Sequence, residues 1–245
     1  MYKAINPNYI SLVKNIKSYF EKSSNTLFQK RNTLKIIEFN NKKLVAKSFK
    51  IPNFINKIAY KYFRDSKAKR SYFNSIKLQE LGVNTPAPIG YIEFGKFTLQ
   101  ESFYVSELFE HDFEIRAVLN DSSFENREQI LKEFVAFSYD LHNKGIYHID
   151  YSPGNVLIKQ EENIYKFAIV DVNRMKFIKF NNELRFKNLS RFSTSIEDLE
   201  LIASEYAKIS NINEKYAKDT LLKYHNEHQE YLERKKRLKA LKGKR

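Results

Sequence analysis

Residues 147–155 read Tyr-His-Ile-Asp-Tyr-Ser-Pro-Gly-Asn, and residues 169–174 read Ile-Val-Asp-Val-Asn-Arg. The first stretch places Asn155 five residues after Asp150, and the second places Asp171 behind a short hydrophobic run. Transfer of a phosphoryl group to a hydroxyl requires one group that orients or deprotonates the acceptor and two that hold a magnesium ion. The two acids and the amide therefore predict a phosphotransferase site.

Each residue of this set has a predicted role. Asp150 is the candidate catalytic base, because a carboxylate in a loop can accept the proton of an acceptor hydroxyl. Asn155 and Asp171 are the candidate metal ligands, and the apolar strand Phe167–Val170 gives Asp171 a rigid mount. His148 is included in the catalytic tract, more as a group that holds the loop than as a proton carrier. The order His-x-Asp-x-x-x-x-Asn, followed by a strand-borne Asp, is typical of kinase-type phosphotransferases.

Lys47 is the main candidate for binding the nucleotide. It ends the run Leu44-Val45-Ala46-Lys47 in a predicted strand, about 100 residues before Asp150. Kinases have this order, and their strand lysine binds the α- and β-phosphates of ATP. Glu107, at the end of the predicted strand 98–108, is a further candidate for binding the cofactor. ATP and Mg²⁺ are therefore the expected cofactors.

The first part of the chain is rich in strand patterns and the second in helix patterns, with the change near residues 107–112. Asn53 and Ser66 are expected to cap two helices, and Gly82 to end the second. Ser122 and Glu125 resemble a capping box in front of a helix that includes residues 130–141. Strands are expected at 26–29, 34–39, 43–49, 89–94, 98–108, 156–159 and 165–170, and further helices at 8–22, 183–191, 194–209 and 213–240.

The composition favours a folded protein with anionic partners. The chain has 245 residues, of which 42% are hydrophobic, and a formal net charge of +14. Residues 231–245 alone contain eight Lys or Arg and one Glu, and seven more basic residues lie between Lys57 and Lys77. Charge of this kind suits phosphorylated substrates, anionic membrane surfaces or nucleic acid.

The sequence also excludes some chemistry. It contains no Cys, so disulfides, thiolate metal sites and a Cys nucleophile are excluded. No stretch approaches the ~18 apolar residues of a membrane span, and the N-terminus lacks the apolar core of a signal peptide. A cytoplasmic protein is therefore expected.

The chain resembles the lipopolysaccharide kinases of the Kdo/heptose kinase group, a bacterial branch of the protein-kinase-like superfamily. The resemblance runs over roughly residues 5–210. Its specific parts are the run Ser66-Lys67-Ala68-Lys69-Arg70-Ser71 and the ending Asp171-Val172-Asn173-Arg174-Met175. The other matching segments are Asn6-Pro7, Lys30-Arg31-Asn32 with Leu34-Lys35, Leu44–Phe49, Ile58–Tyr60, Arg64-Asp65, Gly82–Pro88, Tyr104–Ser106 and the catalytic tract.

The resemblance implies an α+β fold of the bilobal protein-kinase type. An N-terminal antiparallel sheet lobe would occupy residues 1–108, and a mainly helical C-terminal lobe would occupy residues 109–245, including the basic tail 231–245. The implied reaction is ATP-dependent phosphorylation of a sugar hydroxyl, of Kdo or heptose, in the inner core of lipopolysaccharide. By residue it implies Lys47 on the nucleotide phosphates, Asp150 as base, and Asn155 with Asp171 on magnesium.

Two departures from the kinase pattern bear on activity. There is no Gly-rich loop between the first two predicted strands, where Gln29-Lys30-Arg31-Asn32 stands instead. Arg31 and Asn32 are therefore candidates to contact the phosphates through their side chains. The helix 66–81 also lacks the expected Glu partner of Lys47, with Phe73 near its place and Glu80 near the helix end. Weak activity, or a pseudokinase, stays open.

The leading hypothesis is a kinase that acts on the lipopolysaccharide core glycolipid. Such a substrate is anionic and membrane-embedded, so the basic tail is expected to contact an anionic membrane surface peripherally, on the inner face of the cytoplasmic membrane. The alternatives are a protein Ser/Thr/Tyr kinase, a kinase for another small molecule, and a catalytically weak kinase-fold regulatory protein. No nucleic-acid partner is expected, because no recognition module is visible.

Overall fold

The computed structural model describes residues 1–162, 164–192 and 194–242. The chain forms two compact units. Unit 1 comprises Met1–Glu110 and Ala168–Arg174, and unit 2 comprises His111–Phe167 and Met175–Arg245. The short segment that contains Asp171 therefore belongs to unit 1, although its neighbours in the sequence belong to unit 2.

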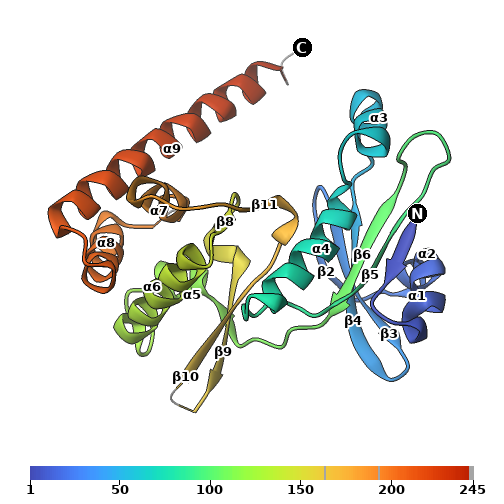
Figure 1. Cartoon of the computed structure of the whole chain (residues 1–245), viewed down its shortest axis with the longest axis horizontal. Helices are drawn as coiled ribbons and strands as arrows, with labels where there is room; N and C mark the ends of the chain where they lie inside the picture. Colours follow the sequence, from blue (N-terminus) through green and yellow to red (C-terminus); the bar gives the residue numbers. More distant parts are fainter. Residues whose placement is uncertain (163, 193, 243–245) are drawn as a thin grey trace. The chain divides into compact units, whose positions relative to one another are not determined.

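Unit 1 is built around an antiparallel sheet with the strand order β1-β5-β6-β4-β3-β2 (Figure 1). The hairpin between β3 and β4 turns through Asn40 and Asn41, which both have positive φ angles, as a tight two-residue hairpin requires. Its strands are β1 (Tyr2–Ala4), β2 (Thr26–Gln29), β3 (Thr33–Phe39), β4 (Lys42–Phe49), β5 (Pro88–Glu93) and β6 (Ser102–Glu107). The predicted strands at 26–29, 34–39 and 43–49 are confirmed; β1 was not predicted.

The two faces of this sheet have separate cores. One core contains Leu12, Val13 and Ile16 from the first helices with Leu44 and Ala46 from β4. The other contains Phe49 of β4 with Ala68 and Tyr72 of α4. Since side chains alternate along a strand, Lys47 shares the second face with Phe49. The Nζ of Lys47 lies 5.4 Å from the centroid of the Phe49 ring.

The helices of unit 1 begin and end largely where their capping residues predict. Asn53 Oδ1 accepts the Asn56 N–H at 3.0 Å to start α3 (Phe54–Tyr62), and Ser66 Oγ accepts the Lys69 N–H at 3.0 Å to start α4 (Lys67–Glu80). Gly82 follows α4 with φ 68°, as predicted. The predicted single helix at 8–22 is wrong in one respect. It is interrupted at Asn15, between α1 (Ile10–Lys14) and α2 (Ile16–Lys22), and a 3-10 turn, η1 (Pro7–Tyr9), precedes it.

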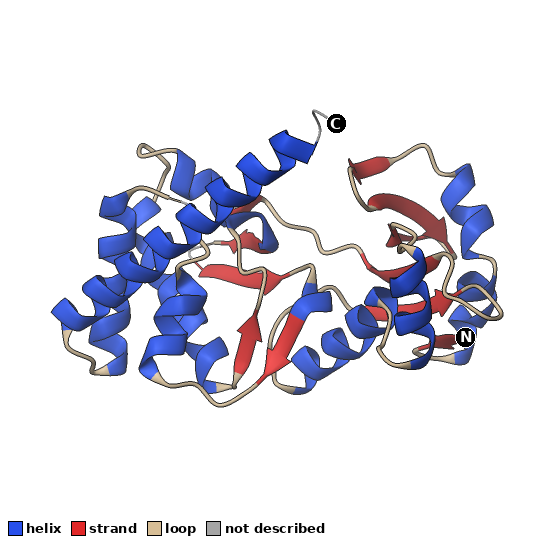
Figure 2. Ribbon diagram, turned by 90° about the horizontal axis from the view of Figure 1, so that it is seen from above, coloured by secondary structure: helices blue, strands red, loops and turns tan. Residues whose placement is uncertain are grey.

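Unit 2 is mainly helical (Figure 2). It contains two small sheets. In the first, β9 lies between β10 and its antiparallel partner β7; in the second, β8 pairs with β11, also antiparallel. The strands are β7 (Phe113–Glu114), β8 (Ile146–His148), β9 (Val156–Glu161), β10 (Ile164–Ile169, whose last two residues belong to unit 1) and β11 (Met175–Phe177). The helices are α5 (Ile115–Asn120), α6 (Arg127–Asn143), α7 (Asn182–Leu189), α8 (Ile196–Ser210) and α9 (Glu214–Lys242).

The predicted capping box at Ser122 and Glu125 is wrong. Helix α6 begins at Arg127, and its N-cap is Asn126, which has φ 55° and makes no side-chain capping bond. The reason is a competing local turn, since Asp121 Oδ1 accepts both the N–H and the hydroxyl of Ser123. This turn bends the chain before the helix can begin.

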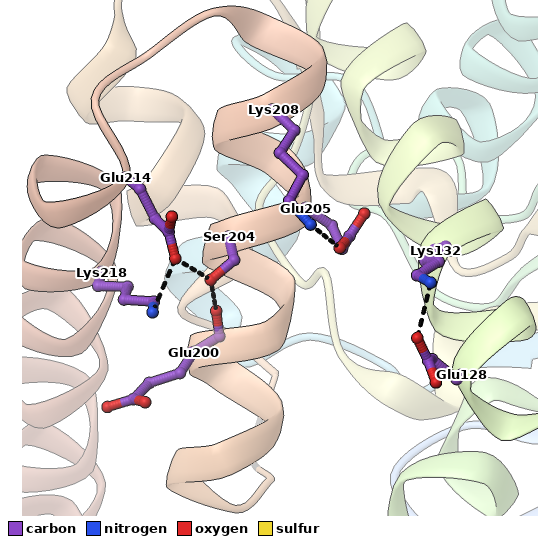
Figure 3. Close-up of polar contacts among 8 residues, drawn as sticks. All are labelled: Glu128, Lys132, Glu200, Ser204, Glu205, Lys208, Glu214 and Lys218. Atoms are coloured by element: carbon purple, nitrogen blue, oxygen red, sulfur yellow. Dashed lines mark hydrogen bonds and ion pairs between the residues drawn. The ribbon is translucent and has the colours of Figure 1, made fainter.

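The junction between α8 and α9 is held by polar side chains (Figure 3). Ser204 Oγ of α8 lies 2.8 Å from the Glu200 carbonyl oxygen and 2.9 Å from Glu214 Oε1 in the first turn of α9. Lys218 pairs with the same Glu214 carboxylate at 2.8 Å. Within the described part of the chain, no helix is both long and apolar enough to cross a membrane.

Candidate active site

Lys47 and Asp171 form an ion pair within unit 1. Lys47 lies on β4 with 9% of its surface exposed, and its Nζ donates to Asp171 Oδ1 at 2.7 Å. Asn173 Nδ2 donates to the same oxygen at 2.5 Å. The backbone of Asp171 has φ 57°, a left-handed conformation that is uncommon for a residue other than Gly. Backbone strain of this kind is concentrated at functional sites.

Helix α4 holds the segment that carries Asp171. Asn74 Nδ2 donates to the Val172 carbonyl oxygen at 2.7 Å, in the short 3-10 turn η3 (Val172–Arg174). On the other side of Asp171, the Ile169 N–H donates to the Asn84 carbonyl oxygen at 3.0 Å. The Asn173 side chain is buried, and its Oδ1 has no hydrogen-bond partner among the described residues. These bonds fix the Asp171 carboxylate next to Lys47.

The partner of Lys47 is thus a residue that the sequence assigned to the metal. Helix α4 supplies no carboxylate to Lys47 in the part of the chain that the structure describes. Glu80 pairs instead with Lys77 at 3.4 Å. Phe73 packs its ring against Tyr72 and Tyr91. The sequence has no Glu at the expected position of this helix, and in the structure Lys47 pairs with Asp171 instead.

Lys67 lies within electrostatic range of both members of this ion pair and of two arginines. Burial lowers the pKa of Lys67, the first residue of α4, and the charges of Arg31, Arg70 and Lys47 act in the same direction, whereas Asp171 opposes them. The Nε of Arg70 is buried without a hydrogen-bond partner among the described residues. Guanidinium and ammonium groups gathered in this way suit phosphate oxygens. The sequence singled out Arg31 but not Lys67, although the run at 66–71 had drawn attention to this helix.

The other two candidates for binding the nucleotide are Asn32 and Glu107. Asn32 Oδ1 accepts the Lys50 N–H at 3.3 Å, so its amide oxygen holds the end of β4. Glu107 is the last residue of β6, opposite Leu44 in the register, and its N–H donates to the Ala87 carbonyl oxygen at 2.8 Å. Both residues stay candidates for binding the nucleotide on their position alone.

The catalytic tract lies in unit 2 and is held from within. His148 ends β8, is buried, and its Nδ1 accepts the Asp150 N–H at 3.1 Å. Asn155 Nδ2 donates to the Asp150 carbonyl oxygen at 2.8 Å. Because its NH₂ group is engaged in the loop, the Asn155 Oδ1 is the atom suited to bind a cation. The bond that His148 accepts from Asp150 supports a loop-holding role, which stays a prediction.

Tyr151 fastens the loop to the core of unit 2. Its side chain is fully buried, and its hydroxyl is 2.8 Å from Ser138 Oγ on α6. Burial raises its pKa, so the phenol is neutral at physiological pH. Its ring meets Phe134 at 6.1 Å and Phe192 at 4.9 Å between centroids. Because the Tyr151 side chain is anchored in the core, it also holds the backbone of Asp150, one residue earlier.

The two predicted metal ligands both offer oxygen atoms. Among the described residues, no group of three or more His, Cys, Asp or Glu is arranged to hold a metal ion. The predicted ligands are instead an amide oxygen of Asn155 in unit 2 and the carboxylate of Asp171 in unit 1. Hard oxygen ligands of this type, with substrate phosphates completing the coordination, are what Mg²⁺ prefers.

Comparison with known proteins supports the kinase interpretation. The model of a family described as the lipopolysaccharide kinase (Kdo/WaaP) family matches residues 29–216. The fold is similar to that of WaaP, solved in complex with acyl carrier protein, with a TM-score of 0.65 and 14% identity over 95% of this chain and 99% of that chain. The bifunctional kinase-methyltransferase WbdD matches with a TM-score of 0.47 and 17% identity over 80% of this chain and 43% of that chain. No curated protein matches the sequence.

Proposed function

This chain belongs to the lipopolysaccharide kinase (Kdo/WaaP) family, and from that premise we propose that it phosphorylates a hydroxyl of Kdo or heptose in the inner core of lipopolysaccharide. It is an ATP-dependent phosphotransferase with an alcohol acceptor, as membership of the family implies. The observation that supports the nucleotide side is the 2.7 Å contact between Lys47 and Asp171. It joins the two predicted ATP-site residues of unit 1 in one polar cluster.

The proposal gives each residue a task. Lys47 and Lys67 bind nucleotide phosphates, with Arg31 beside them. Asn155 and Asp171 hold Mg²⁺, which, when bound, neutralises charge on the phosphates. Asp150 orients the acceptor hydroxyl and takes its proton as the oxygen bonds to the γ-phosphorus and the bond to ADP breaks. His148 acts as a positioning residue, because it binds the Asp150 N–H.

The direct test is phosphate transfer from labelled ATP to purified core glycolipids. One acceptor ends in Kdo and the other carries heptose, so the labelled product identifies the sugar. Asp150→Asn is expected to reduce turnover at least about 10²-fold, because general-base catalysis contributes on that order, while ATP still binds. The matched control is Asp219→Asn, an exposed aspartate that pairs with Lys215. Full turnover in the Asp150 variant would exclude Asp150 as the catalytic base.

A catalytically weak regulatory protein is the second candidate. The lack of a carboxylate on α4 beside Lys47, among the described residues, favours it. Such a protein would bind ATP with magnesium but release no labelled product with glycolipid or protein acceptors. Transfer to protein acceptors alone would instead favour a protein kinase. The glycolipid assay therefore separates the three functions.

We also propose that the basic tail makes a peripheral contact with the inner face of the cytoplasmic membrane. The described end of α9 combines the exposed apolar residues Tyr231, Leu238 and Leu241 with basic residues at 234–237. A helix with both kinds of side chain binds anionic lipid surfaces. Deleting residues 231–245 is expected to lower sedimentation with anionic vesicles while turnover of a soluble acceptor persists. Equal sedimentation of both forms would rule this contact out.

A further inference from the structure

The end of α7 and the residues that follow it, 188–192, lie against the catalytic loop of unit 2. Asn188 Nδ2 donates to the His148 carbonyl oxygen at 2.8 Å. The rings of Phe192 and Tyr151 are 4.9 Å apart. Since His148 and Tyr151 lie on either side of Asp150 in the chain, both ends of the segment 188–192 are attached next to the candidate base. Arg191 lies between these two attachments.

Arg191 has no carboxylate partner within ion-pair distance among the described residues. Its Nη1 lies 2.9 Å from Nδ1 of His228 on α9, and the side chain is partly buried. By contrast, the partly buried Arg127 of the same unit pairs with Asp198 at 2.5 Å. A guanidinium has five N–H donors in a rigid fork. Arg191 therefore retains donors for an anion that the protein itself does not supply.

His228 connects Arg191 electrostatically to the candidate base. Burial lowers the pKa of His228, the positive charges of Arg191 and His225 act in the same direction, and the Asp150 carboxylate opposes them. Burial thus favours the neutral ring. Because Nδ1 accepts the Arg191 N–H, the neutral ring carries its hydrogen on Nε2, as a donor. One helical turn earlier, His225 is buried against the backbone of Ser190 and Phe192, which fixes α9 to this segment.

We propose that Arg191 and His228 bind an anionic group of the acceptor, beside the hydroxyl that Asp150 activates. The proposal rests on the kinase function above and names its substrate class: an acidic sugar, or one that carries a phosphate on a neighbouring ring. Asp150 would repel such an acceptor, and the guanidinium offsets this repulsion. Carboxylate and phosphate share the geometry that an Arg fork recognises, so the source of the charge is left to the experiment.

The test measures acceptor binding and turnover separately. The probes are a methyl glycoside of Kdo, the same glycoside with its carboxylate converted to an amide, and a phosphorylated heptose glycoside. Arg191→Ala is expected to weaken binding of an anionic probe by about 10- to 100-fold in calorimetry without ATP, the range for a hydrogen bond to a charged group. The variant is expected to raise KM for that acceptor while KM for ATP stays unchanged. Preference for the carboxylate or the phosphate probe identifies the charge.

The controls separate this role from a structural one. Lys215→Ala changes an exposed lysine on α9, paired with Asp219, and is expected to change neither quantity. Arg191→Lys, which keeps the charge but not the fork, is expected to recover part of the affinity. Equal affinity of wild type and Arg191→Ala for both anionic probes would overturn the proposal. Binding that depends on Arg191 without any turnover would uphold it and contradict the kinase function instead.

A second inference rests on an exposed apolar surface of unit 1. Helix α3 has no buried residue, and Phe54, Ile55 and Phe63 are 71%, 77% and 81% exposed. Phe97, in the loop between β5 and β6, and Tyr62 are also exposed. Lys57, Lys61 and Arg64 add positive charge along the same helix. We call the set Phe54, Ile55, Lys57, Lys61, Tyr62, Phe63, Arg64 and Phe97 the α3 surface.

The α3 surface is held together as one piece. Tyr62 Oη donates to the Phe97 carbonyl oxygen at 3.0 Å, and Lys61 Nζ donates to that of Gly95 at 2.9 Å. The Leu99 N–H donates to the Lys57 carbonyl oxygen at 3.2 Å. These bonds fix the helix to the loop while the aromatic rings stay in water. Exposed apolar surface gathered in this way marks an interaction site.

We propose that the occupant of the α3 surface is an anionic lipid surface. Aromatic side chains enter the headgroup region, and the basic residues pair with lipid phosphates. The double variant Phe54→Ser and Phe63→Ser is expected to lower binding to phosphatidylglycerol vesicles by about tenfold or more, given the apolar area lost. Ile164→Ser, at an exposed apolar position of unit 2, is the matched control.

The vesicle experiment distinguishes an anionic lipid surface from a second copy of the chain as the occupant of the α3 surface. Unchanged vesicle binding in the double variant would overturn the proposal. So would concentration-dependent dimerisation that the double variant abolishes, because the surface would then bind a second copy. The double variant is also combined with deletion of residues 231–245. A further loss of vesicle binding in the combined variant, beyond that of the tail deletion, would uphold the α3 surface as a separate contact.

Discussion

Lys47 donates to the same oxygen of Asp171 that receives the Asn173 amide, so one carboxylate oxygen joins β4 to the turn after β10. Removing Lys47 would leave this carboxylate without its cation and the nucleotide without a phosphate ligand. Lys47→Met is expected to lower kcat/KM for ATP by about 100-fold or more, which corresponds to ~3 kcal/mol. Steady-state kinetics would measure this, with Lys50→Met, at the exposed residue that follows β4, as control. A loss of less than threefold would contradict the role of Lys47.

Lys67 offers a second test of the phosphate cluster, with Lys69 as its neighbour for comparison. Lys67 lies among Arg31, Arg70 and Lys47, and its pKa is lowered. Lys69 instead pairs with Asp65 at 2.7 Å. Lys67→Met is expected to raise KM for ATP by about tenfold, as loss of one charge-assisted bond does. Lys69→Met is expected to leave KM for ATP unchanged, and equal effects of the two would contradict the assignment.

Buried His142 predicts a dependence of stability on pH. Burial lowers its pKa from an ordinary value of 6.5 to about 3, with Arg185 acting in the same direction and the Asn188 contact opposing it. Between these two values only the unfolded chain binds the proton, so stability falls as pH drops from about 6.5 towards 3. Above pH 6.5 the residue makes no pH-dependent contribution.

The variant His142→Gln isolates this effect. Protonation of other groups affects the stability of both proteins equally, so the difference between their melting temperatures reports on residue 142. The wild-type melting temperature is expected to fall more steeply than that of the variant between pH 6.5 and 5. Parallel curves over this range would show that His142 can be protonated in the folded state.

The pair Arg127–Asp198 is predicted to be important for the stability of unit 2. Asp198 is buried, and its two carboxylate oxygens accept from Arg127 Nη2 at 2.5 Å and Thr194 Oγ1 at 2.6 Å. Asp198→Ala would leave the guanidinium without its partner, at a cost of about 3–5 kcal/mol. Urea unfolding measures the loss. Asp219→Ala, at an exposed pair, is expected to change stability by less than ~1 kcal/mol.

The parts of the fold that depend on local chemistry were predictable from the sequence. The caps at Asn53 and Ser66 and the end of α4 at Gly82 follow from side chains within a few residues. The split of the first helix at Asn15 and the start of α6 at Asn126 were missed. In both places a short-range bond, from Asn15 to Ser11 or from Ser123 to Asp121, competes with the apolar pattern.

Contacts between distant residues were not predictable in this way. The pairing of β8 with β11 joins residues about 30 positions apart, and the short strands carry little pattern of their own. Asn74 and Arg191 acquire their positions only when η3 and α9 pack beside them. The motif therefore predicts roles for Asp150, Asn155 and Asp171, which stay predictions, whereas the residues that contact them were found only in the three-dimensional structure.

The length of α9 has a consequence for which hydroxyl can be phosphorylated. This helix runs without interruption from Glu214 to Lys242 and carries His228 as well as the apolar residues Tyr231, Leu238 and Leu241. His228 and Leu238 are ten residues apart, which corresponds to about 15 Å along a helix. The proposed contact of this tail with lipid therefore predicts that α9 sets the distance between the membrane surface and the acceptor sugar.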